Sequence, residues 1–259
     1  MTDVMTDREV RQFDEAGCVT IDTPLSARQV DDACAVFDRL LPCSDGCPRQ
    51  SRTCNYYDPP LLDIIQHPFF EEAAQRALRA ETVQFFQSAI VTAYPEPCKP
   101  FSFWQHVDLQ YRLSDFQSEP KRILCSFFLW LTDVNESRAP MMFRPGSHLL
   151  IGAEREHDPA RVTVPPRVEP VALDDLPALR YADPIPLTAR AGQVTVLTTA
   201  AIHGASVNVD IEPRKNLVLT FLASGVALGL PPHEEAQRRE YNRELRTYLR
   251  AERIHIIPD

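Results

Sequence analysis

Two side chains in the segment 101–112 could together hold a metal ion. His106 and Asp108 stand two residues apart in the sequence FSFWQHVDLQYR, whose aromatic and β-branched residues favour a β-strand. In a strand, residues two apart point to the same face, so the imidazole and the carboxylate would lie side by side. Because a His followed by an Asp at this spacing is common by chance, the pair alone is weak evidence for a site.

A second histidine would complete the site, and His203 is the preferred candidate. It ends the strand-like segment QVTVLTTAAIH, whose apolar approach would carry the imidazole into a pocket, and Gly204 follows where close approach of another backbone segment is needed. His148, at the end of the turn RPGSH, is the alternative. The pair His233 and Glu235 is expected to be a solvated helix end, because residues two apart on a helix point in different directions.

Two imidazoles and one carboxylate form the ligand set of non-haem Fe(II) oxygenases, which leaves coordination positions open. Arg214 stands eleven residues after His203, and an oxygenase that uses 2-oxoglutarate needs a cation for the far carboxylate of that co-substrate. Arginine suits this task because its planar guanidinium keeps its charge and can donate two parallel hydrogen bonds. A zinc hydrolase could use the same three ligands with a water molecule, so the residues alone leave both chemistries open.

Helices are expected to precede the strands that carry these residues. Residues 1–81 are interpreted as an N-terminal helical support. The expected elements are helices that begin after capping boxes at Thr6 and Ser26, a strand over 18–22, a loop over 43–60 and a third helix over 68–80. Only one strand is therefore expected in this part of the chain.

From residue 82 the chain becomes rich in β-branched and aromatic residues. The candidate strands lie at 82–94, 101–112, 123–132, 141–143, 193–199 and 216–224. A Pro-rich insert over 150–187 interrupts the β-rich region 82–225, and loops of that size are usually functional. A charged helix is expected over 232–253. This organisation predicts a single domain over 1–259, mainly β with flanking helices.

The composition excludes several classes of function. The chain has 27 basic and 36 acidic residues, and its net charge of −9 argues against a nucleic-acid partner. The longest apolar run, 123–131, is too short to cross a membrane, and the N-terminus resembles no signal peptide. We therefore expect a cytoplasmic monomer or homodimer that acts on a small molecule. The seven cysteines suggest reduced thiols. Cys43, Cys47 and Cys54 cluster, but their spacing matches no familiar zinc pattern and no fourth ligand is evident.

Four segments, taken in order, resemble one protein family. They are WQHVD at 104–108, ILCSFFLWLTDV at 123–134, MMFRPGSHLL at 141–150 and IHGASVNVDIEPRKNLVLTF at 202–221. Together with the opening FDEAGCVTID, they resemble the phytanoyl-CoA dioxygenase family of Fe(II)/2-oxoglutarate oxygenases, including its ectoine-hydroxylase-like bacterial members. The resemblance covers residues 8–225 and is more specific than any single motif.

The resemblance implies a double-stranded β-helix, the jelly roll of cupin-like proteins, and a set of site residues. Fe(II) would be bound by His106, Asp108 and His203. Arg214 would pair with the distal carboxylate of 2-oxoglutarate, and Gln87, in a Gln-Ser pair on the preceding strand, would be a polar contact to the same co-substrate. Many members carry a small hydroxyl residue two places after the distal histidine. This chain has Ala205 there, and Ser206 follows as the candidate hydroxyl contact.

The activity implied by the resemblance is hydroxylation, or a related oxidation, of an unactivated C–H bond in a small metabolite. O2 would be consumed, and succinate and CO2 would be released. Asp108 favours hydroxylation, because halogenating relatives lack this carboxylate. Candidate substrate contacts are Tyr111, Arg112, Trp130 and Arg144. Two alternatives remain, a metal- and 2-oxoglutarate-binding sensor module without turnover and a zinc-dependent hydrolase.

Overall fold

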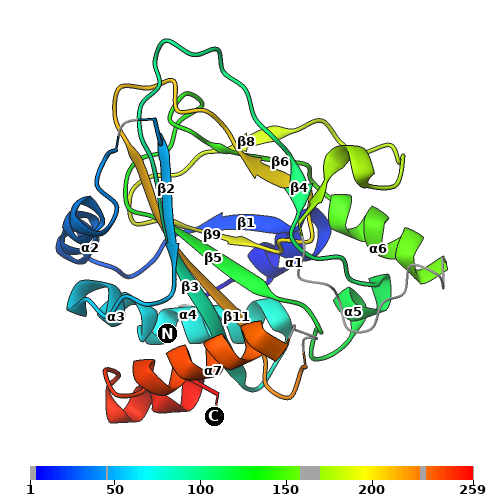
Figure 1. Cartoon of the computed structure of the whole chain (residues 1–259). Coiled ribbons are helices and arrows are strands. Elements are labelled where there is room, and N and C mark those ends of the chain that lie inside the picture. The colour runs from blue at the N-terminus through cyan, green and yellow to red at the C-terminus, as the bar shows by residue number, and fades with distance from the viewer. Residues whose placement is uncertain (1–3, 45, 158–169, 228–231, 259) are drawn as a thin grey trace.

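Two antiparallel β-sheets lie one above the other, with helices on the outer side of the larger sheet (Figure 1). The computed structural model describes residues 4–44, 46–157, 170–227 and 232–258. The larger sheet has the strand order β1-β9-β5-β11-β3-β2, and the smaller sheet has the order β7-β4-β10-β6-β8. This arrangement confirms the prediction of a mainly β jelly roll with flanking helices.

Each sheet draws strands from distant parts of the chain. The larger sheet consists of β1 (Cys18–Ile21), β2 (Arg49–Thr53), β3 (Val83–Ala93), β5 (Cys125–Trp130), β9 (Val194–Leu197) and β11 (Arg214–Ala223). The smaller sheet consists of β4 (His106–Val107), β6 (Met141–Phe143), β7 (Val171–Ala172), β8 (Ile185–Leu187) and β10 (His203–Ala205). All pairs of neighbouring strands are antiparallel.

The helices are short, and no described helix is both long and apolar enough to cross a membrane. They are α1 (Asp7–Ala16), α2 (Ala27–Leu40), α3 (Pro59–Ile65), α4 (Pro68–Leu78), α5 (Leu113–Gln117), α6 (Ser147–His157) and α7 (Pro232–Leu245), with the 3-10 helices η2 (Leu173–Asp175) and η3 (Ala251–Ile256). In Figure 1, α3, α4 and α7 lie below the larger sheet, and α5 and α6 lie beside it.

Both predicted capping boxes are present. The Thr6 hydroxyl accepts a hydrogen bond from Glu9 N at 3.3 Å, and the Glu9 carboxylate accepts one from Thr6 N at 2.7 Å. Ser26 and Gln29 form the same reciprocal pair at the start of α2. α1 ends at Gly17, whose φ of 90° is left-handed and therefore suits glycine. The predicted starts of these two helices are confirmed.

The predicted loop 43–60 and the predicted strand 101–112 are both wrong in part. The loop contains the strand β2 and the start of α3. β2 has the polar sequence RQSRT at a sheet edge, so it lacks the hydrophobic alternation that indicates a strand. The segment 101–112 is a strand only at β4: the aromatic residues before it are exposed, and only an isolated bridge pairs Phe103 with Ser206.

The chain also differs from prediction near its end and in its Pro-rich insert. The helix predicted over 232–253 ends at Leu245, and the N–H of Arg250 donates instead to the Gln66 side chain at 2.9 Å, which fixes the start of η3. The insert 150–187 supplies most of α6 and both edge strands of the smaller sheet, β7 and β8. Residues 158–169 of this insert lie outside the described residues.

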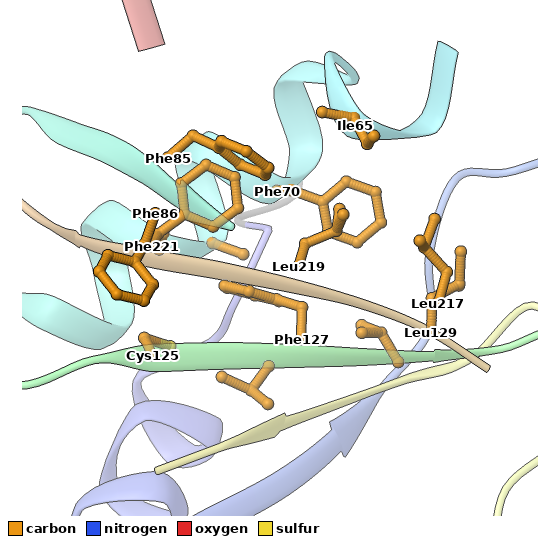
Figure 2. Close-up of a cluster of buried hydrophobic side chains, with 14 of the residues drawn as sticks. Ile65, Phe70, Phe85, Phe86, Cys125, Phe127, Leu129, Leu217, Leu219 and Phe221 are labelled. Atoms are coloured by element: carbon orange, nitrogen blue, oxygen red, sulfur yellow. The ribbon is translucent and has the colours of Figure 1, made fainter. Parts of the chain in front are cut away.

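The main hydrophobic core lies between the larger sheet and the helices α3 and α4 (Figure 2). Phe70 of α4 packs edge-on against Phe127 of β5, with ring centroids 5.8 Å apart, and Phe127 packs in the same way against Phe221 of β11. Leu217 and Leu219 extend this face along β11. Burial of each such side chain contributes about 1.5–3 kcal/mol, so this layer holds the sheet rigidly against the helices.

The opposite face of the larger sheet carries a smaller core with polar groups. Trp130 of β5 packs with Met141 and Phe143 of the smaller sheet, and its Nε1 donates to Thr195 Oγ1 at 2.9 Å. Successive strand residues point to opposite faces. Arg214 therefore points into the jelly roll, whereas Leu217 and Leu219 of the same strand point toward the helices. The strand therefore contributes to the core and to the interior of the jelly roll at once.

His148 is buried against α1, away from the other histidines that could bind a metal. It is 2% exposed, its Nε2 donates to the Asp14 carbonyl at 3.2 Å, and its ring packs edge-on against Phe116. Burial lowers the pKa of His148 to about 4. The imidazole is therefore neutral in the folded protein at every pH above about 4.

We expect the free energy of unfolding to fall as the pH drops from 6.5 to 4, by up to about 3 kcal/mol from His148 alone. The unfolded chain binds a proton at this histidine below its ordinary pKa, whereas the folded chain does not until about pH 4. Urea unfolding at pH 7 and pH 4.5 would measure the loss. His148→Gln, which keeps a donor but cannot titrate, should lose less stability between these two pH values. An equal loss in both proteins would contradict the assignment.

Candidate metal centre

His106, Asp108 and His203 converge on one point. Their ligand atoms all lie within 4.8 Å of one another. Asp108 Oδ1 is 3.0 Å from His106 Nε2, and Asp108 Oδ2 is 3.8 Å from His203 Nε2. Among the described residues, no other group of three His, Cys, Asp or Glu side chains is arranged in this way. The structure thus brings together the three residues that the sequence selected.

Strand pairing explains this convergence. β4 and β10 are antiparallel, and His106 lies directly opposite His203. Directly opposed residues project from the same face of a sheet, and the two imidazole centroids are 4.7 Å apart. Asp108 follows β4, and its N–H donates to the Thr199 carbonyl at 2.9 Å, which holds the carboxylate beside the two rings.

Each histidine ring is held from behind. His203 Nδ1 donates to the Ala201 carbonyl at 2.9 Å, so the lone pair is on Nε2, which is directed at Asp108. The Trp104 indole stacks on the His106 ring at 4.4 Å between centroids. We call His106, Asp108 and His203 the metal-ligand group. Both histidine rings are therefore oriented by contacts with residues outside this group.

The protonation states suit a metal ion. Burial lowers the pKa of His203, so its imidazole is neutral at neutral pH and offers a lone pair. Burial acts in the opposite direction on Asp108, but the hydrogen bond with His106 and the electrostatic influence of both histidines outweigh it, and the pKa of Asp108 is lowered. Asp108 is thus an ionised ligand between two imidazoles.

Gly204 allows β10 to approach the chain before β4. A Cβ atom at this position would lie 1.7 Å from the Trp104 carbonyl oxygen and 2.8 Å from its carbonyl carbon. A backbone carbonyl this close leaves no room for any side chain. The close approach expected at Gly204 from the sequence is therefore present, and it is part of the contact that joins His106 to His203.

Arg214 is a buried cation that has no counter-charge within the described part of the chain. The residue is 2% exposed, and its Nε and Nη2 atoms have no hydrogen-bond partner among the described residues. Its guanidinium carbon lies 5.7 Å from the centre of a Trp130 ring. Burial, and then the like charge of Arg49, lowers the pKa of Arg214 to about 9. Because an unpaired buried charge is costly, this guanidinium is prepared to receive a carboxylate.

The other two residues expected to contact the co-substrate have different surroundings. Gln87 lies six residues along β3 from Ala93, which pairs with Arg214, and this separation is about 20 Å in a strand. Gln87 lines another cavity, next to α7, so the structure does not bring it to the metal-ligand group. Ser206 is buried three residues after His203, but its hydroxyl already donates to the Pro140 carbonyl at 2.7 Å.

Two of the four candidate substrate contacts point elsewhere. Tyr111 is 2% exposed, and its hydroxyl accepts a hydrogen bond from Leu124 N at 3.0 Å, so it belongs to the main core. The backbone N–H of Arg112 donates to Asp115 at the start of α5. The chain thus leaves the strand after β4 and turns into α5, which places the Tyr111 side chain in the main core and Arg112 at the start of the helix.

Trp130 and Arg144 do lie near the site, but each has a structural contact. Trp130 lies beneath the guanidinium of Arg214, where it excludes water from that cation. Arg144 Nε donates to Gln105 Oε1 at 2.8 Å, and its Nη1 donates to the Ala182 carbonyl at 2.8 Å. Arg144 thus ties the residue before His106 to the end of the Pro-rich insert.

Sequence reasoning missed Arg49 and the aromatic residues before β4. Arg49 lines a cavity of about 390 Å³ together with Phe103, Trp104 and Ser206. Its guanidinium interacts electrostatically with Asp108. The sequence did contain a signal, the aromatic residues of the segment 101–104 beside the candidate ligand His106. The structure shows that these rings are exposed, as is usual for a binding surface. The polar sequence of β2 offered no such signal.

Cys43, Cys47 and Cys54, which lie close together in the sequence, are not among the side chains that the described residues bring together as a metal-binding group. Cys43 and Cys47 are exposed. Cys54 is half-buried, and its Sγ donates to the Ser88 carbonyl at 3.7 Å. Burial raises the pKa of Cys54 to about 11, so it is a thiol rather than a thiolate at neutral pH.

Comparison with known sequences identifies similar proteins over most of the chain. A family model described as phytanoyl-CoA dioxygenase (PhyH) matches residues 13–216. The chain is 27% identical over 192 residues to the ectoine dioxygenase of Bordetella parapertussis, and 26% identical over the same length to that of Bordetella bronchiseptica. Each match covers 71% of this chain, which thus spans about 60% of the length of these curated relatives.

Solved structures share the fold at low sequence identity. A non-haem α-ketoglutarate-dependent carbocyclase of nogalamycin biosynthesis, SnoK, has a TM-score of 0.66 and 20% identity, with 91% of this chain and 90% of that chain covered. EctD from S. alaskensis has a TM-score of 0.62 and 17% identity, with 89% and 81% covered. The epimerase SnoN, solved with Fe3+, α-ketoglutarate and nogalamycin RO, has a TM-score of 0.61 and 18% identity, with 84% and 83% covered.

Gly204→Ala is expected to abolish metal binding and to destabilise the protein by about 2 kcal/mol or more, because the added methyl group would overlap the Trp104 carbonyl and push β10 away from β4. Calorimetric titration with Ni²⁺ and thermal unfolding would measure both effects. Ala205→Gly is the matched control, since it alters the same strand without adding an atom. A Gly204→Ala protein that binds Ni²⁺ as tightly as the wild type would show that the close contact is unnecessary.

Proposed function

The chain belongs to the phytanoyl-CoA dioxygenase family, and we propose that it is an Fe(II)- and 2-oxoglutarate-dependent oxygenase. The proposed reaction is hydroxylation, or a related oxidation, of an unactivated C–H bond in a small-molecule metabolite. O2 is consumed, and 2-oxoglutarate is converted to succinate and CO2. The jelly roll and the similarity to ectoine dioxygenases support this proposal.

The observation that carries the proposal is the buried guanidinium of Arg214 near the metal-ligand group. Arg214 pairs with Ala93 of β3, and Ala93 pairs with Arg49 of β2, so the two guanidinium groups project from the same face of the larger sheet. Activation of a water molecule by zinc needs three ligands and an open position, and it does not itself require a buried cation. 2-Oxoglutarate has two carboxylates, one that can chelate a metal with the keto oxygen and one that needs a cation at a distance. The pocket supplies both partners.

Each residue of the site has a distinct task in this proposal. Two imidazoles and one carboxylate, from His106, Asp108 and His203, would hold Fe(II) and leave the remaining positions for 2-oxoglutarate and O2. When bound, Fe(II) supplies O2 activation coupled to the oxidation of 2-oxoglutarate. Arg214 would orient the far carboxylate, and Trp130 beneath it would keep water from that ion pair.

Loading the protein with Fe(II) and 2-oxoglutarate without O2 is expected to give the visible charge-transfer band of the chelate, and admission of O2 is expected to yield succinate. Asp108→Ala should lose both signals, because two imidazoles alone hold the metal weakly. Asp32→Ala is the control, since Asp32 is an exposed partner of Arg28 on α2.

Three results would reject the oxygenase. Succinate release by Asp108→Ala at the wild-type rate would remove the assigned ligand. A charge-transfer band without succinate, across a panel of metabolites, would favour a binding module. Hydrolytic activity that zinc restores and ferrous iron does not would favour the hydrolase.

Arg214→Gln is expected to raise the Kd for 2-oxoglutarate about 10- to 100-fold, since a charge-assisted hydrogen bond contributes about 1.5–3 kcal/mol. Titration of the charge-transfer band with 2-oxoglutarate measures this change. Arg28→Gln, an exposed arginine on α2, should leave the Kd unchanged. An unaltered Kd in Arg214→Gln would assign the far carboxylate to another group.

A further inference from the structure

Strand β2 brings a second guanidinium to the face that carries Arg214. β2 pairs with β3, with Arg49 opposite Ala93, and β3 pairs with β11, with Ala93 opposite Arg214. Directly opposed residues project from the same face, so both arginines point inward. Their Cα atoms are two strand spacings apart, about 10 Å, and only the methyl group of Ala93 stands between them.

The two arginines differ in how far they are buried. Arg214 is buried, whereas β2 is an edge strand and Arg49 is exposed. The side chain of Arg49 forms no hydrogen bond or ion pair with any described residue, yet it interacts electrostatically with Asp108. Arg214 therefore lies in the interior, whereas Arg49 lies at the mouth of the cavity that it lines together with Phe103 and Trp104.

The charges of the pocket favour one more anion. Arg49 and Arg214 repel each other, and Asp108 already contacts both histidines. Glu96 lines the same cavity as Arg49, but its carboxylate is paired with Lys99. The far carboxylate of 2-oxoglutarate would neutralise Arg214 and leave Arg49 without a partner. A second carboxylate at the mouth would neutralise Arg49 and would lie within reach of the metal-ligand group.

The cavity lined by Arg49 also has an aromatic wall. Phe103 and Trp104 line it and are 40% and 57% exposed. Trp104 stacks on His106, so a molecule lying on this indole would be next to a metal ligand. The volume, about 390 Å³, is within the range of small-molecule sites. A cavity that is lined by the rings of Phe103 and Trp104 and by the guanidinium of Arg49 suits a molecule with an apolar body and an acidic group.

We propose that Arg49 is a second carboxylate-binding residue of the site. Its position at the mouth, opposite the aromatic wall, favours a carboxylate of the C–H substrate, which is then an acid with an apolar body. The same chemistry could come from the metal-side carboxylate of 2-oxoglutarate, and the experiment below separates these two sources. The inference rests on the proposed function, because that function assigns the far carboxylate of 2-oxoglutarate to Arg214.

The test measures binding to the Fe(II)-loaded full chain without O2. The probes are 2-oxoglutarate, and then 3-phenylpropionate and its neutral amide in the presence of saturating 2-oxoglutarate. The fluorescence of the two tryptophans, Trp104 and Trp130, reports binding, because both lie beside the site. Arg49→Gln is compared with Arg49→Lys, which retains the charge, and with Arg52→Gln, an exposed arginine on the opposite face of the same strand.

Arg49→Gln is expected to weaken the binding of one carboxylate about 10-fold or more, with partial recovery in Arg49→Lys and no change in Arg52→Gln. Loss of 3-phenylpropionate binding, with the amide and 2-oxoglutarate unaffected, identifies the substrate as the source. Loss of 2-oxoglutarate binding identifies the co-substrate. The proposal is overturned if 2-oxoglutarate affinity is unchanged in Arg49→Gln and the protein does not distinguish 3-phenylpropionate from its amide through this residue.

These outcomes are separate from those that test the proposed function. A protein that binds 2-oxoglutarate and releases succinate, but in which Arg49→Gln changes neither affinity, refutes the role of Arg49 alone. A protein that never binds 2-oxoglutarate refutes the function itself. Equal melting temperatures of the three variants would exclude misfolding as the cause of any loss.

Discussion

The antiparallel contact between β4 and β10 is the interaction on which the site depends. It consists of few backbone pairs, yet it sets His106 opposite His203 and leaves Asp108 beside them. The contact exists only because Gly204 has no side chain where the Trp104 carbonyl passes. The three side chains proposed to bind the metal are thus brought together because position 204 has no side chain.

The larger sheet makes this small contact reliable. Its outer face is fastened to α3 and α4 by aromatic and aliphatic packing, so its inner face can carry groups that would destabilise a weaker fold. Arg214 and Trp130 are such groups: one is a buried cation, and the other is an indole that fills the space beneath it. Each strand places alternate residues on the two faces of the sheet. The burial of apolar side chains on one face thus offsets the free-energy cost of burying polar groups on the other.

The residues that could be predicted from sequence are those in which local geometry and chemistry coincide. His106 and Asp108 follow from the two-residue repeat of a strand, and His203 and Arg214 follow from their place at strand ends. Gln87 was assigned to the site by the family resemblance and Tyr111 by its nearness to Asp108 in sequence. The course of β3 takes Gln87 away from the metal-ligand group, and the Tyr111 side chain lies in the main core. Arg49 could not be found in this way, because only the register of β2 against β3 reveals which face it shares.

The polar edge strand has a consequence for how such a protein can diverge. β2 lies outside the hydrophobic core, and its side chains are largely exposed, so substitutions there should alter stability little. The same strand borders the cavity that Arg49 lines together with Phe103 and Trp104. Substitutions along β2 could therefore change which molecules bind, while the buried residues of the core stay the same. Protein engineering could use the same positions.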